Sequence, residues 1–325
     1  MEHRSVNPVS RPDVTWQGVQ TAQENGFTGN SLGLSLMKNK LPDITLKPVV
    51  LESIRLALAE DVESGDATTL SLVSEDCIVD AEILAKEDCI VSGGDVAAAV
   101  FAMLDDSFKV DVIIADGAPA ASGDIILKLH GLARTILTGE RTALNFMQRM
   151  TGMATMTATF VELVAQYDCH ILDTRKTTPT LRSFEKYAVL CGGGTNHRFG
   201  LFDKVMIKDN HRRLWRDGDG GDLAAAVLEA RRQYPDLEIE IEVEDESELR
   251  NALDGSPEWI LLDNMSPELM AKCVEITAGR SKLEASGGIT LVNVEAAAKS
   301  GVDAISLGCL THSAPSVDLS LEISE

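Results

Sequence analysis

The sequence contains little that would suit a nucleic-acid-binding or membrane protein. Aromatic residues make up only 4% of its 325 residues, which leaves few side chains on which bases could stack. Acidic residues outnumber basic ones by 51 to 29, and the net charge of −22 excludes general binding of nucleic acid through a basic surface. No apolar run approaches the roughly 18 residues of a membrane-spanning helix. We therefore expect no nucleic-acid partner and no membrane.

The six cysteines form no pattern typical of a metal site or a disulfide framework. None of them lies in a C-x-x-C pair, which favours reduced thiols and a cytoplasmic location. The hydrophobic share of 44% and the charged share of 25% are ordinary for a globular protein. At about 150 residues per domain, the length suggests two domains.

The chain divides into three stretches of different pattern. Residues 1–45 show no periodicity, lack the apolar core of a secretory signal and carry acidic residues that argue against a transit peptide, so we interpret them as an N-terminal extension. From about 46 to 145, a helical stretch at Val49–Glu60, an acidic loop at 60–66 and strand-like runs at Asp80–Val91, Val110–Ala115 and Asp124–Leu129 predict a mixed α+β layer. A long helix is predicted over Gly139–Gln166.

After that helix, short apolar runs alternate with helical patterns. The runs are His170–Asp173, Lys204–Ile207, Glu238–Val243, Trp259–Leu262, Leu283–Ala285 and Ala304–Leu307. The helical patterns between the later runs are Asp222–Tyr234, Glu246–Leu253, Pro267–Ala278 and Leu291–Lys299. This alternation predicts parallel strands with helices outside. Six units are fewer than the eight of a complete barrel, and no G-x-G-x-x-G follows the first strand, so the pattern favours an incomplete, open α/β barrel.

Polar residues follow nearly every predicted strand, at the edge where parallel α/β folds place their sites. Residues 173–213 hold nine Lys or Arg and four Asp or Glu, a local charge of 9 − 4 = +5 in an acidic protein. This contrast predicts a pocket for a small, highly anionic ligand. Arg175, Lys176 and Lys208 directly follow apolar strands and are candidate ligand contacts, because Arg offers forked donors and Lys a compact charge. Other cations of the stretch are interpreted as a solvated helix face, namely Lys186, Arg212 and Arg213.

Two glycine-rich turns and two carboxylates complete the candidate site. Gly192–Gly194 leads into His197 and Arg198, and Ser286–Gly288 follows a strand in the geometry that can hold a phosphate, with Gly308 after the next strand. A plain βα turn is an equal alternative for the serine-glycine loop. Carboxylates at neighbouring strand ends would suit Mg²⁺ together with ligand phosphates. The candidates are Asp263 and one of Glu240, Glu242 and Glu244, which share one face of a strand.

These segments together resemble the quinolinate phosphoribosyltransferase family over about residues 46–325, in one order. The matching segments include Gly139–Arg141, Asp173–Pro179 (DTRKTTP), His197–Arg198, Ile207–His211 (IKDNH), Leu262–Asn264 and Glu284–Gly288 (EASGG). The resemblance implies an N-terminal α/β sandwich domain over 46–143, to which 313–325 returns, and an incomplete α/β barrel of about six parallel strands over 144–312. It also implies a homodimer in which each partner closes the other's site.

The implied reaction converts quinolinate and phosphoribosyl pyrophosphate to nicotinate mononucleotide, pyrophosphate and CO2, with Mg²⁺, in the synthesis of NAD. By motif, the resemblance assigns substrate binding to Arg175, His197, Arg198, Lys208 and, from the neighbouring subunit, Arg141. It assigns Lys176, Glu242 and Asp263 as catalytic, with Glu242 and Asp263 on the ribose and metal side, and the 5′-phosphate to Ser286, Gly287, Gly288 and Gly308.

The sequence departs from the family at three places. Thr180 stands where the family usually has Gly, and neither the insertion around Trp215–Gly221 nor the N-terminal extension has a family counterpart. Two alternatives to the implied activity stay open at this point. One is a relative on the same scaffold that acts on a different anionic ring, such as the homologues associated with molybdenum transport. The other is a non-catalytic regulatory or assembly protein that kept the pocket.

Overall fold

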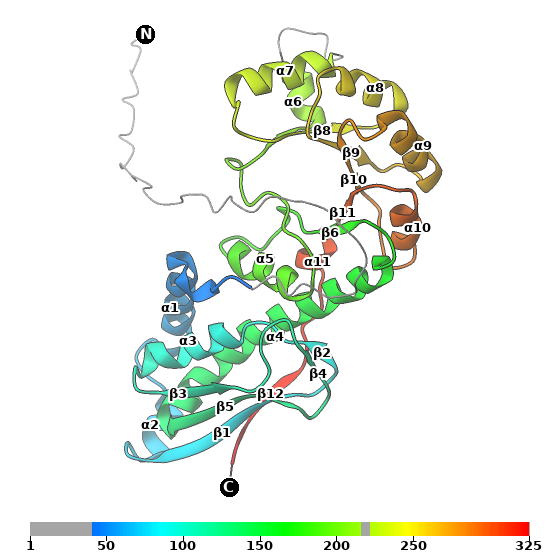
Figure 1. Cartoon of the computed structure of the whole chain (residues 1–325). Helices are drawn as coiled ribbons and strands as arrows, with labels where there is room; N and C mark the ends of the chain where they lie inside the picture. The colour runs from blue at the N-terminus through cyan, green and yellow to red at the C-terminus, as the bar shows by residue number, and fades with distance from the viewer. Residues whose placement is uncertain (1–40, 216–221, 325) are drawn as a thin grey trace, which may run out of the picture. The chain divides into compact units, whose positions relative to one another are not determined.

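A computed structural model describes residues 41–215 and 222–324. The predicted N-terminal extension lies outside these residues up to position 40, and the insertion lies outside them from 216 to 221. Two larger sheets and the helices that pack on them make up the described part (Figure 1). Within it, no helix combines the length and the hydropathy needed to cross a bilayer.

The first sheet is antiparallel and has the strand order β12-β1-β5-β3. Its strands are β1 (Ile78–Ala85), β3 (Lys109–Val112), β5 (Ile125–Leu132) and β12 (Leu319–Ile323), and a small ribbon pairs β2 (Cys89–Ile90) with β4 (Pro119–Ala120). The helices of this region are η1 (Ile44–Leu46), α1 (Pro48–Val62), α2 (Ala67–Leu72) and α3 (Gly94–Leu104). Because β12 pairs with β1, with Ala81 opposite Ile323, the C-terminal segment returns to this sheet.

Three sequence predictions in this region were wrong in detail. The single strand expected over Asp80–Val91 is two strands, β1 and β2, separated by a turn. The strand expected to reach Ala115 ends at Val112, and α1 continues to Val62, so the first residues of the expected acidic loop are helical. Apolar and turn residues are interleaved in these places, and the sequence pattern alone does not locate an element's end.

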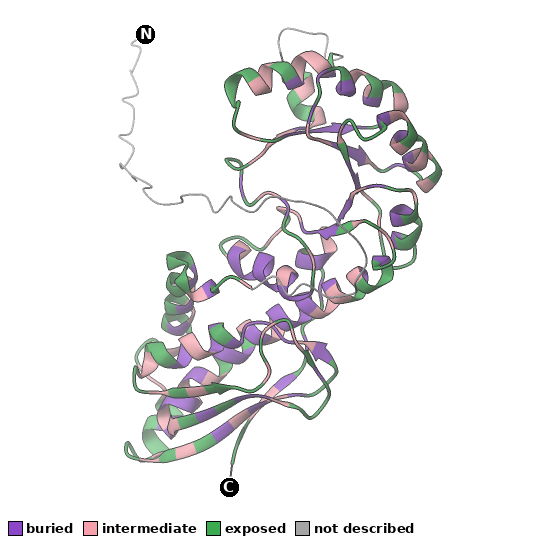
Figure 2. Ribbon diagram, viewed as in Figure 1, coloured by how far each residue is buried: buried purple, intermediate pink, exposed green. Residues whose placement is uncertain are grey.

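Helix α4 (Ala133–Val164) joins the two halves of the described chain and begins before the predicted Gly139. Its first half packs Ile136 and Met147 into the core under the antiparallel sheet, and its last turns pack Phe160 into the core of the parallel sheet (Figure 2). Gly152 permits a close approach, because a Cβ there would lie 1.9 Å from the carbonyl oxygen of Pro315. The predicted boundary between residues 143 and 144 falls inside this helix, and the division into domains stays a prediction.

The second sheet has six parallel strands in the order β6-β11-β10-β9-β8-β7. The strands are β6 (His170–Leu172), β7 (Val205–Ile207), β8 (Ile239–Val243), β9 (Trp259–Asp263), β10 (Lys282–Ser286) and β11 (Ala304–Ser306). The helices are α5 (Arg182–Cys191), α6 (Asp209–Leu214), α7 (Leu223–Gln233), α8 (Glu246–Asp254), α9 (Pro267–Thr277), α10 (Val294–Lys299) and α11 (Cys309–His312). In the described chain no ladder joins the edge strands β6 and β7, so the predicted incomplete barrel is confirmed.

Helix-start signals directly after the strands keep the connections at the carboxyl edge short. The side chain of Asp245 accepts a hydrogen bond from Glu248 N at 2.9 Å and caps α8, so only two residues separate the end of β8 from the start of α8. Ser266 caps α9 in the same way, and Pro267 occupies the first turn, where its missing N–H costs nothing. The strands therefore present their last residues at one edge of the sheet.

Candidate active site

Six of the residues predicted for the site lie at the carboxyl edge of the parallel sheet. Asp263 at the end of β9 is opposite Ser286 at the end of β10, and Ser306 at the end of β11 is opposite Leu172 at the end of β6. Because neighbouring strands end in register, the residues that follow them lie at the same edge. These residues are Lys176, Lys208, Glu242, Asp263, Ser286 and Gly308.

Lys208 and Glu242 form an ion pair between the ends of β7 and β8, with the Nζ atom hydrogen-bonded to Oε2. The Lys208 side chain is 42% exposed, whereas that of Glu242 is 12% exposed. Of the three acidic residues that alternate along this segment, Glu240 is fully buried, Glu242 lies at the rim and Glu244 is exposed. The structure therefore separates carboxylates that the sequence could not.

The loop after β10 has the backbone expected of an anion-binding turn. Gly287 and Gly288 both have positive φ, at 89° and 65°. A Cβ on Gly287 would lie 2.2 Å from Oδ1 of Asn264, so only glycine fits there. Asn264 itself donates from Nδ2 to Asp263 Oδ2 at 2.8 Å. This contact ties the phosphate-type loop to the carboxylate on the neighbouring strand.

Lys176 and Gly308 lie next to each other although 132 residues separate them. A Cβ on Gly308 would lie 3.1 Å from Cδ of Lys176, and Thr311 Oγ1 in α11 donates to the carbonyl oxygen of Lys176 at 2.8 Å. The Lys176 side chain therefore passes beside the turn that follows β11. This arrangement suits the binding of a phosphate by a cation and a small-residue turn.

Arg175 and Arg198 place two guanidinium groups close together. The Nε atom of Arg175 is buried and has no hydrogen-bond partner among the described residues. Burial lowers the pKa of Arg198, and the nearby charge of Arg175 lowers it further. Since unpaired buried donors are costly and like charges repel, an anion bound between the two groups would relieve both effects.

His197 is held inside the barrel rather than at its surface. Its Nε2 atom lies 3.0 Å from Glu240 Oε2 and 3.3 Å from Glu284 Oε2, and Nδ1 accepts the N–H of Arg198 at 2.7 Å. Although burial disfavours the charged ring, the hydrogen bonds to the two carboxylates raise the pKa of His197 to about 9. Among the described residues, these three side chains are the one group close enough to hold a metal ion together. These contacts are ion pairs, because Nε2 and the four carboxylate oxygens have no hydrogen-bond partner of good geometry among the described residues. Lys204 Nζ also lies 3.0 Å from Glu240 Oε2.

The interpretation of Lys186 as part of a solvated face was wrong. Lys186 in α5 is only 2% exposed, and its Nζ atom donates to Asp173 Oδ1 and to the carbonyl oxygen of His197. Asp173 is fully buried and also accepts the N–H of His197 at 2.9 Å. Burial raises the pKa of Asp173 to about 6 against the opposing effect of Lys186. Arg212 is also paired, with Glu248, whereas Arg213 is exposed as expected.

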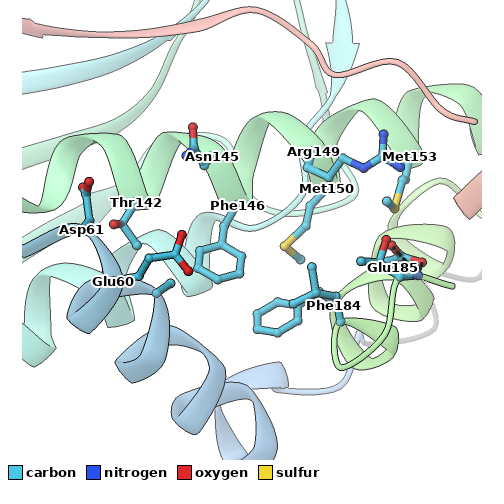
Figure 3. Close-up of a pocket in the computed structure, with 13 residues that line it drawn as sticks. Glu60, Asp61, Thr142, Asn145, Phe146, Arg149, Met150, Met153, Phe184 and Glu185 are labelled. Atoms are coloured by element: carbon cyan, nitrogen blue, oxygen red, sulfur yellow. Dashed lines mark hydrogen bonds between the residues drawn. The ribbon is translucent and has the colours of Figure 1, made fainter. Parts of the chain in front are cut away.

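Arg141 is not among the residues that the fold brings to this edge. It lies on α4 with its side chain 59% exposed, and the ion pair found for it in the described chain is with Glu140 at 4.0 Å. A separate cavity of about 250 Å³ lies between α1, α4 and α5 (Figure 3). Stacked Phe146 and Phe184 line it, with ring centroids 4.9 Å apart, and Glu60 reaches it from α1. It contains none of the predicted cationic strand-end residues.

Two domain families match nearly the whole described chain. Residues 66–151 match "Quinolinate phosphoribosyl transferase, N-terminal domain", and residues 153–322 match the C-terminal domain of the same name. The chain is 42% identical to the probable nicotinate-nucleotide pyrophosphorylase (carboxylating) of Bacillus subtilis, over 81% of this chain and 90% of that protein. It is 41% identical to the chloroplastic nicotinate-nucleotide pyrophosphorylase (carboxylating) of Arabidopsis thaliana, over 91% and 88%. The solved nicotinate-nucleotide pyrophosphorylase from Francisella tularensis superposes with a TM-score of 0.79 at 39% identity, covering 85% of this chain and 96% of that one.

The chain belongs to the quinolinate phosphoribosyltransferase family. Membership confirms the resemblance read from the motifs, and the mixed α/β fold agrees with the solved relatives. In this phosphoribosyltransferase the roles assigned to single residues remain predictions. Sequence reasoning did not single out the inner residues of the barrel, Asp173, Lys186, Glu240 and Glu284, as a connected group.

One signal in the phosphoribosyltransferase sequence could have found these inner residues. Glu240 and Glu284 are charged residues within short apolar runs predicted to be strands of a covered parallel sheet. Such residues are seldom buried unless they are paired. A buried carboxylate therefore requires a buried donor nearby, although the sequence does not say which one.

Proposed function

We propose that the protein catalyses the reaction of quinolinate with phosphoribosyl pyrophosphate to give nicotinate mononucleotide, pyrophosphate and CO2, in de novo NAD biosynthesis. Its membership of the family and its similarity to carboxylating nicotinate-nucleotide pyrophosphorylases support this assignment. The observation that carries it is a pair of neighbouring guanidinium groups, from Arg175 after β6 and Arg198 in the loop before β7, with the buried Arg175 Nε lacking a partner among the described residues. Quinolinate is a planar dianion, and such a pair matches adjacent carboxylates.

In the proposed complex, Arg175, Arg198 and Lys208 hold the two quinolinate carboxylates. His197 lies directly behind Arg198 and belongs to the same subsite. Lys208 is paired with Glu242 and 42% exposed, so it can exchange this partner for a substrate carboxylate. Neutralising the dianion in a partly buried site requires several cations, and this edge of the sheet supplies them.

Phosphoribosyl pyrophosphate would occupy the neighbouring strand ends. Ser286, Gly287, Gly288 and Gly308 would bind the 5′-phosphate. Gly287 and Gly288 have positive φ, which can turn backbone N–H groups toward a bound anion, and Gly308 begins the turn after β11. Lys176 beside Gly308 would lie between this phosphate and the quinolinate subsite.

Glu242 and Asp263 would hold Mg²⁺ and contact the ribose. They offer oxygen ligands on neighbouring strands, and Mg²⁺ commonly uses one or two carboxylates with substrate phosphates and water, so the donors fit this ion. When bound, Mg²⁺ would neutralise charge on the departing pyrophosphate. The pairing of Glu242 with Lys208 means that substrate binding would also free this carboxylate.

The chemistry then follows from orientation. As pyrophosphate leaves, positive character develops at ribose C1, which Glu242 or Asp263 would stabilise. Attack by the ring nitrogen on ribose C1 makes a pyridinium. When the adjacent carboxylate leaves as CO2, the electron pair of the broken bond stays on the ring carbon, stabilised by the positive nitrogen beside it, and that carbon takes up a proton from water to give nicotinate mononucleotide. The protein needs no covalent cofactor, because holding both reactants in place can supply roughly 7–11 kcal/mol.

The proposal is tested with carboxyl-labelled quinolinate. The full chain with phosphoribosyl pyrophosphate and Mg²⁺ should release labelled CO2 and form nicotinate mononucleotide. Lys208→Ala should lower kcat/KM by roughly 30- to 150-fold, equivalent to about 2–3 kcal/mol. The matched control is Lys272→Ala, which removes an exposed lysine paired with Glu246. Pyrophosphate release with another anionic ring and no labelled CO2 would favour the relative with a different substrate, and binding of both substrates without turnover would favour a regulatory protein.

We also propose a homodimer in which Arg141 completes the partner's site. Its exposed position on α4, rather than in a loop after a strand of the parallel sheet, supports this role. The test mixes the inactive variants Arg141→Ala and Lys208→Ala after dissociation. If sites are shared, about a quarter of them should be intact in the mixture and activity should return. No recovery in a mixture shown to contain hybrids would contradict sharing.

The cytoplasmic location stays a proposal as well. All six cysteines lie in the described residues, and none of them forms a disulfide bond. Reduced thiols are typical of cytosolic proteins, which supports this location. Fractionation of the source cells with an antibody to the chain would test it.

A further inference from the structure

Buried polar side chains form a continuous network inside the open barrel, beneath the strand ends. Its members come from five different elements or the turns beside them, and each side chain is at most 12% exposed. They are Asp173, Lys186, His197, Lys204, Glu240 and Glu284. None except His197 has a role in the proposed reaction, and their burial in the barrel calls for a reason.

One end of the network holds the main chain of His197. Asp173 Oδ1 accepts the His197 N–H at 2.9 Å, and Lys186 Nζ donates to the His197 carbonyl oxygen at 3.0 Å. Since Lys186 also donates to Asp173 Oδ1, a single buried ion pair binds both peptide groups of this residue. Charge-assisted hydrogen bonds of this kind are among the strongest that a protein forms.

The other end holds the ring. Nε2 lies 3.0 Å from Glu240 Oε2 and 3.3 Å from Glu284 Oε2, so the ring is placed between two buried carboxylates. Nδ1 faces the N–H of Arg198 at 2.7 Å. A flip of the ring would therefore take Nδ1 away from the Arg198 N–H and Nε2 away from the two carboxylates.

The network also reaches the guanidinium of Arg198. Its Nη1 atom donates to the carbonyl oxygen of Lys204 at 3.1 Å, and Lys204 Nζ is bound to Glu240 Oε2 at 3.0 Å. The Lys204 ammonium also lies 4.7 Å from the centre of the Trp259 ring. Arg198 is thus tied at its main chain through His197 and at its side chain through Lys204.

We infer that Asp173, Lys186, Glu240, Glu284 and Lys204 are positioning residues, which fix His197 at its main chain and ring and thereby set the Arg198 guanidinium for a quinolinate carboxylate. This inference rests on the proposed function. The network contains three carboxylates against two lysines and a histidine, so it adds little net positive charge. Its contribution is therefore geometric and should act on quinolinate more than on phosphoribosyl pyrophosphate.

The test compares Glu284→Gln with the unchanged enzyme in the full chain. Glutamine keeps the shape of the side chain and removes its charge. We expect the KM and the calorimetric Kd for quinolinate to rise about tenfold, with the KM for phosphoribosyl pyrophosphate changed less than about twofold. Glu258→Gln is the matched control, because Glu258 lies at the opposite end of the sheet and pairs with Arg231. This variant should not raise the KM for quinolinate more than the KM for phosphoribosyl pyrophosphate.

A second variant keeps the test decisive if Glu284→Gln does not fold. Lys204→Gln removes the cation beside Glu240. It should likewise raise the KM for quinolinate while changing the KM for phosphoribosyl pyrophosphate much less. Equal effects of either variant on both substrates, or a quinolinate KM and Kd within about twofold of the unchanged enzyme, would overturn the inference.

A measurement that does not depend on catalysis can test this inference independently of the proposed function. Nitrogen NMR of ¹⁵N-histidine-labelled enzyme, with the His197 signal identified by its loss in His197→Asn, should show a proton on Nε2 that is perturbed in Glu284→Gln. An unprotonated Nε2 would overturn the inference even in an active enzyme. An enzyme inactive on quinolinate with the expected NMR signal would instead refute the proposed function.

Discussion

Replacing Lys186 by Met should destabilise the protein strongly, in a way that depends on pH. The ammonium is almost fully buried and binds Asp173, which is fully buried itself. In the variant, Asp173 keeps the His197 N–H at 2.9 Å and the amide of Asn196, which in its satisfied orientation donates at 2.6 Å. Removing one partner of a buried ion pair costs about 3–5 kcal/mol, because the other charge remains without compensation.

The pH dependence follows from the direction of the Asp173 shift. Burial raises its pKa from 3.8 to about 6 while Lys186 is present, and loss of the ammonium raises it further. A carboxyl group whose pKa is raised in the folded state contributes less stability as pH rises from the unfolded-state pKa to the folded-state pKa, by at most about 1.4 kcal/mol per pH unit, and above the folded-state pKa its contribution stays constant. Because the folded-state pKa of Asp173 is higher in the variant, the variant continues to lose stability as pH rises above about 6, whereas the stability of the unchanged protein no longer depends on Asp173 there. The free energy of unfolding of Lys186→Met should therefore fall far below that of the unchanged protein at pH 8, and less far below it at pH 5.5.

Urea unfolding of the full chain at both pH values, at one protein concentration, measures this loss. The double variant Asp173→Asn/Lys186→Met should be more stable than Lys186→Met at pH 8, because no buried charge is left unpaired. Lys128→Met, which breaks an exposed pair with Glu82, should change stability by less than about 1 kcal/mol. A Lys186→Met protein as stable as the unchanged one at pH 8, or equally destabilised at both pH values, would refute the reasoning.

Three further substitutions test other features. Thr180 has a φ of 70°, so Thr180→Gly should relieve backbone strain and stabilise the protein by about 0.5–1 kcal/mol, and a lower melting temperature would contradict this. Gly152→Ala should destabilise it by about 3 kcal/mol, since its Cβ would meet Pro315 at 1.9 Å, and an unchanged melting temperature would show that the two segments separate easily. Asp263→Ala should chiefly raise the Mg²⁺ and phosphoribosyl pyrophosphate concentrations needed for half-maximal rate, about tenfold, and an unchanged metal dependence would argue against its role.

The position of Thr180 shows where a motif is informative and where it is not. The family resemblance places Gly where this chain has Thr180, and Thr180 has a left-handed φ of 70°, which glycine adopts at little cost. A sequence comparison detects the departure, but the sign of φ follows only from the folded chain.

The sequence by itself determined the open barrel, the family and the strand-end residues of the candidate site. Alternating apolar runs and helical patterns specify parallel strands, and parallel strands place the residues after them at one edge. This rule already brings together the segments that two observed contacts join. These contacts are the ion pair between Lys208 and Glu242 and the approach of Lys176 to Gly308.

Only the tertiary structure decided which charges lie inside the barrel. Lys186 has the sequence context of a surface helix, and Glu240, Glu242 and Glu244 alternate in one strand, yet their exposures differ widely. A charged side chain is buried when a partner from another element compensates it, and the partners of Lys186 and Glu240 are 13 and 43 residues away, in Asp173 and His197. Local sequence carries no record of such pairs, because they form only when distant strands close around them.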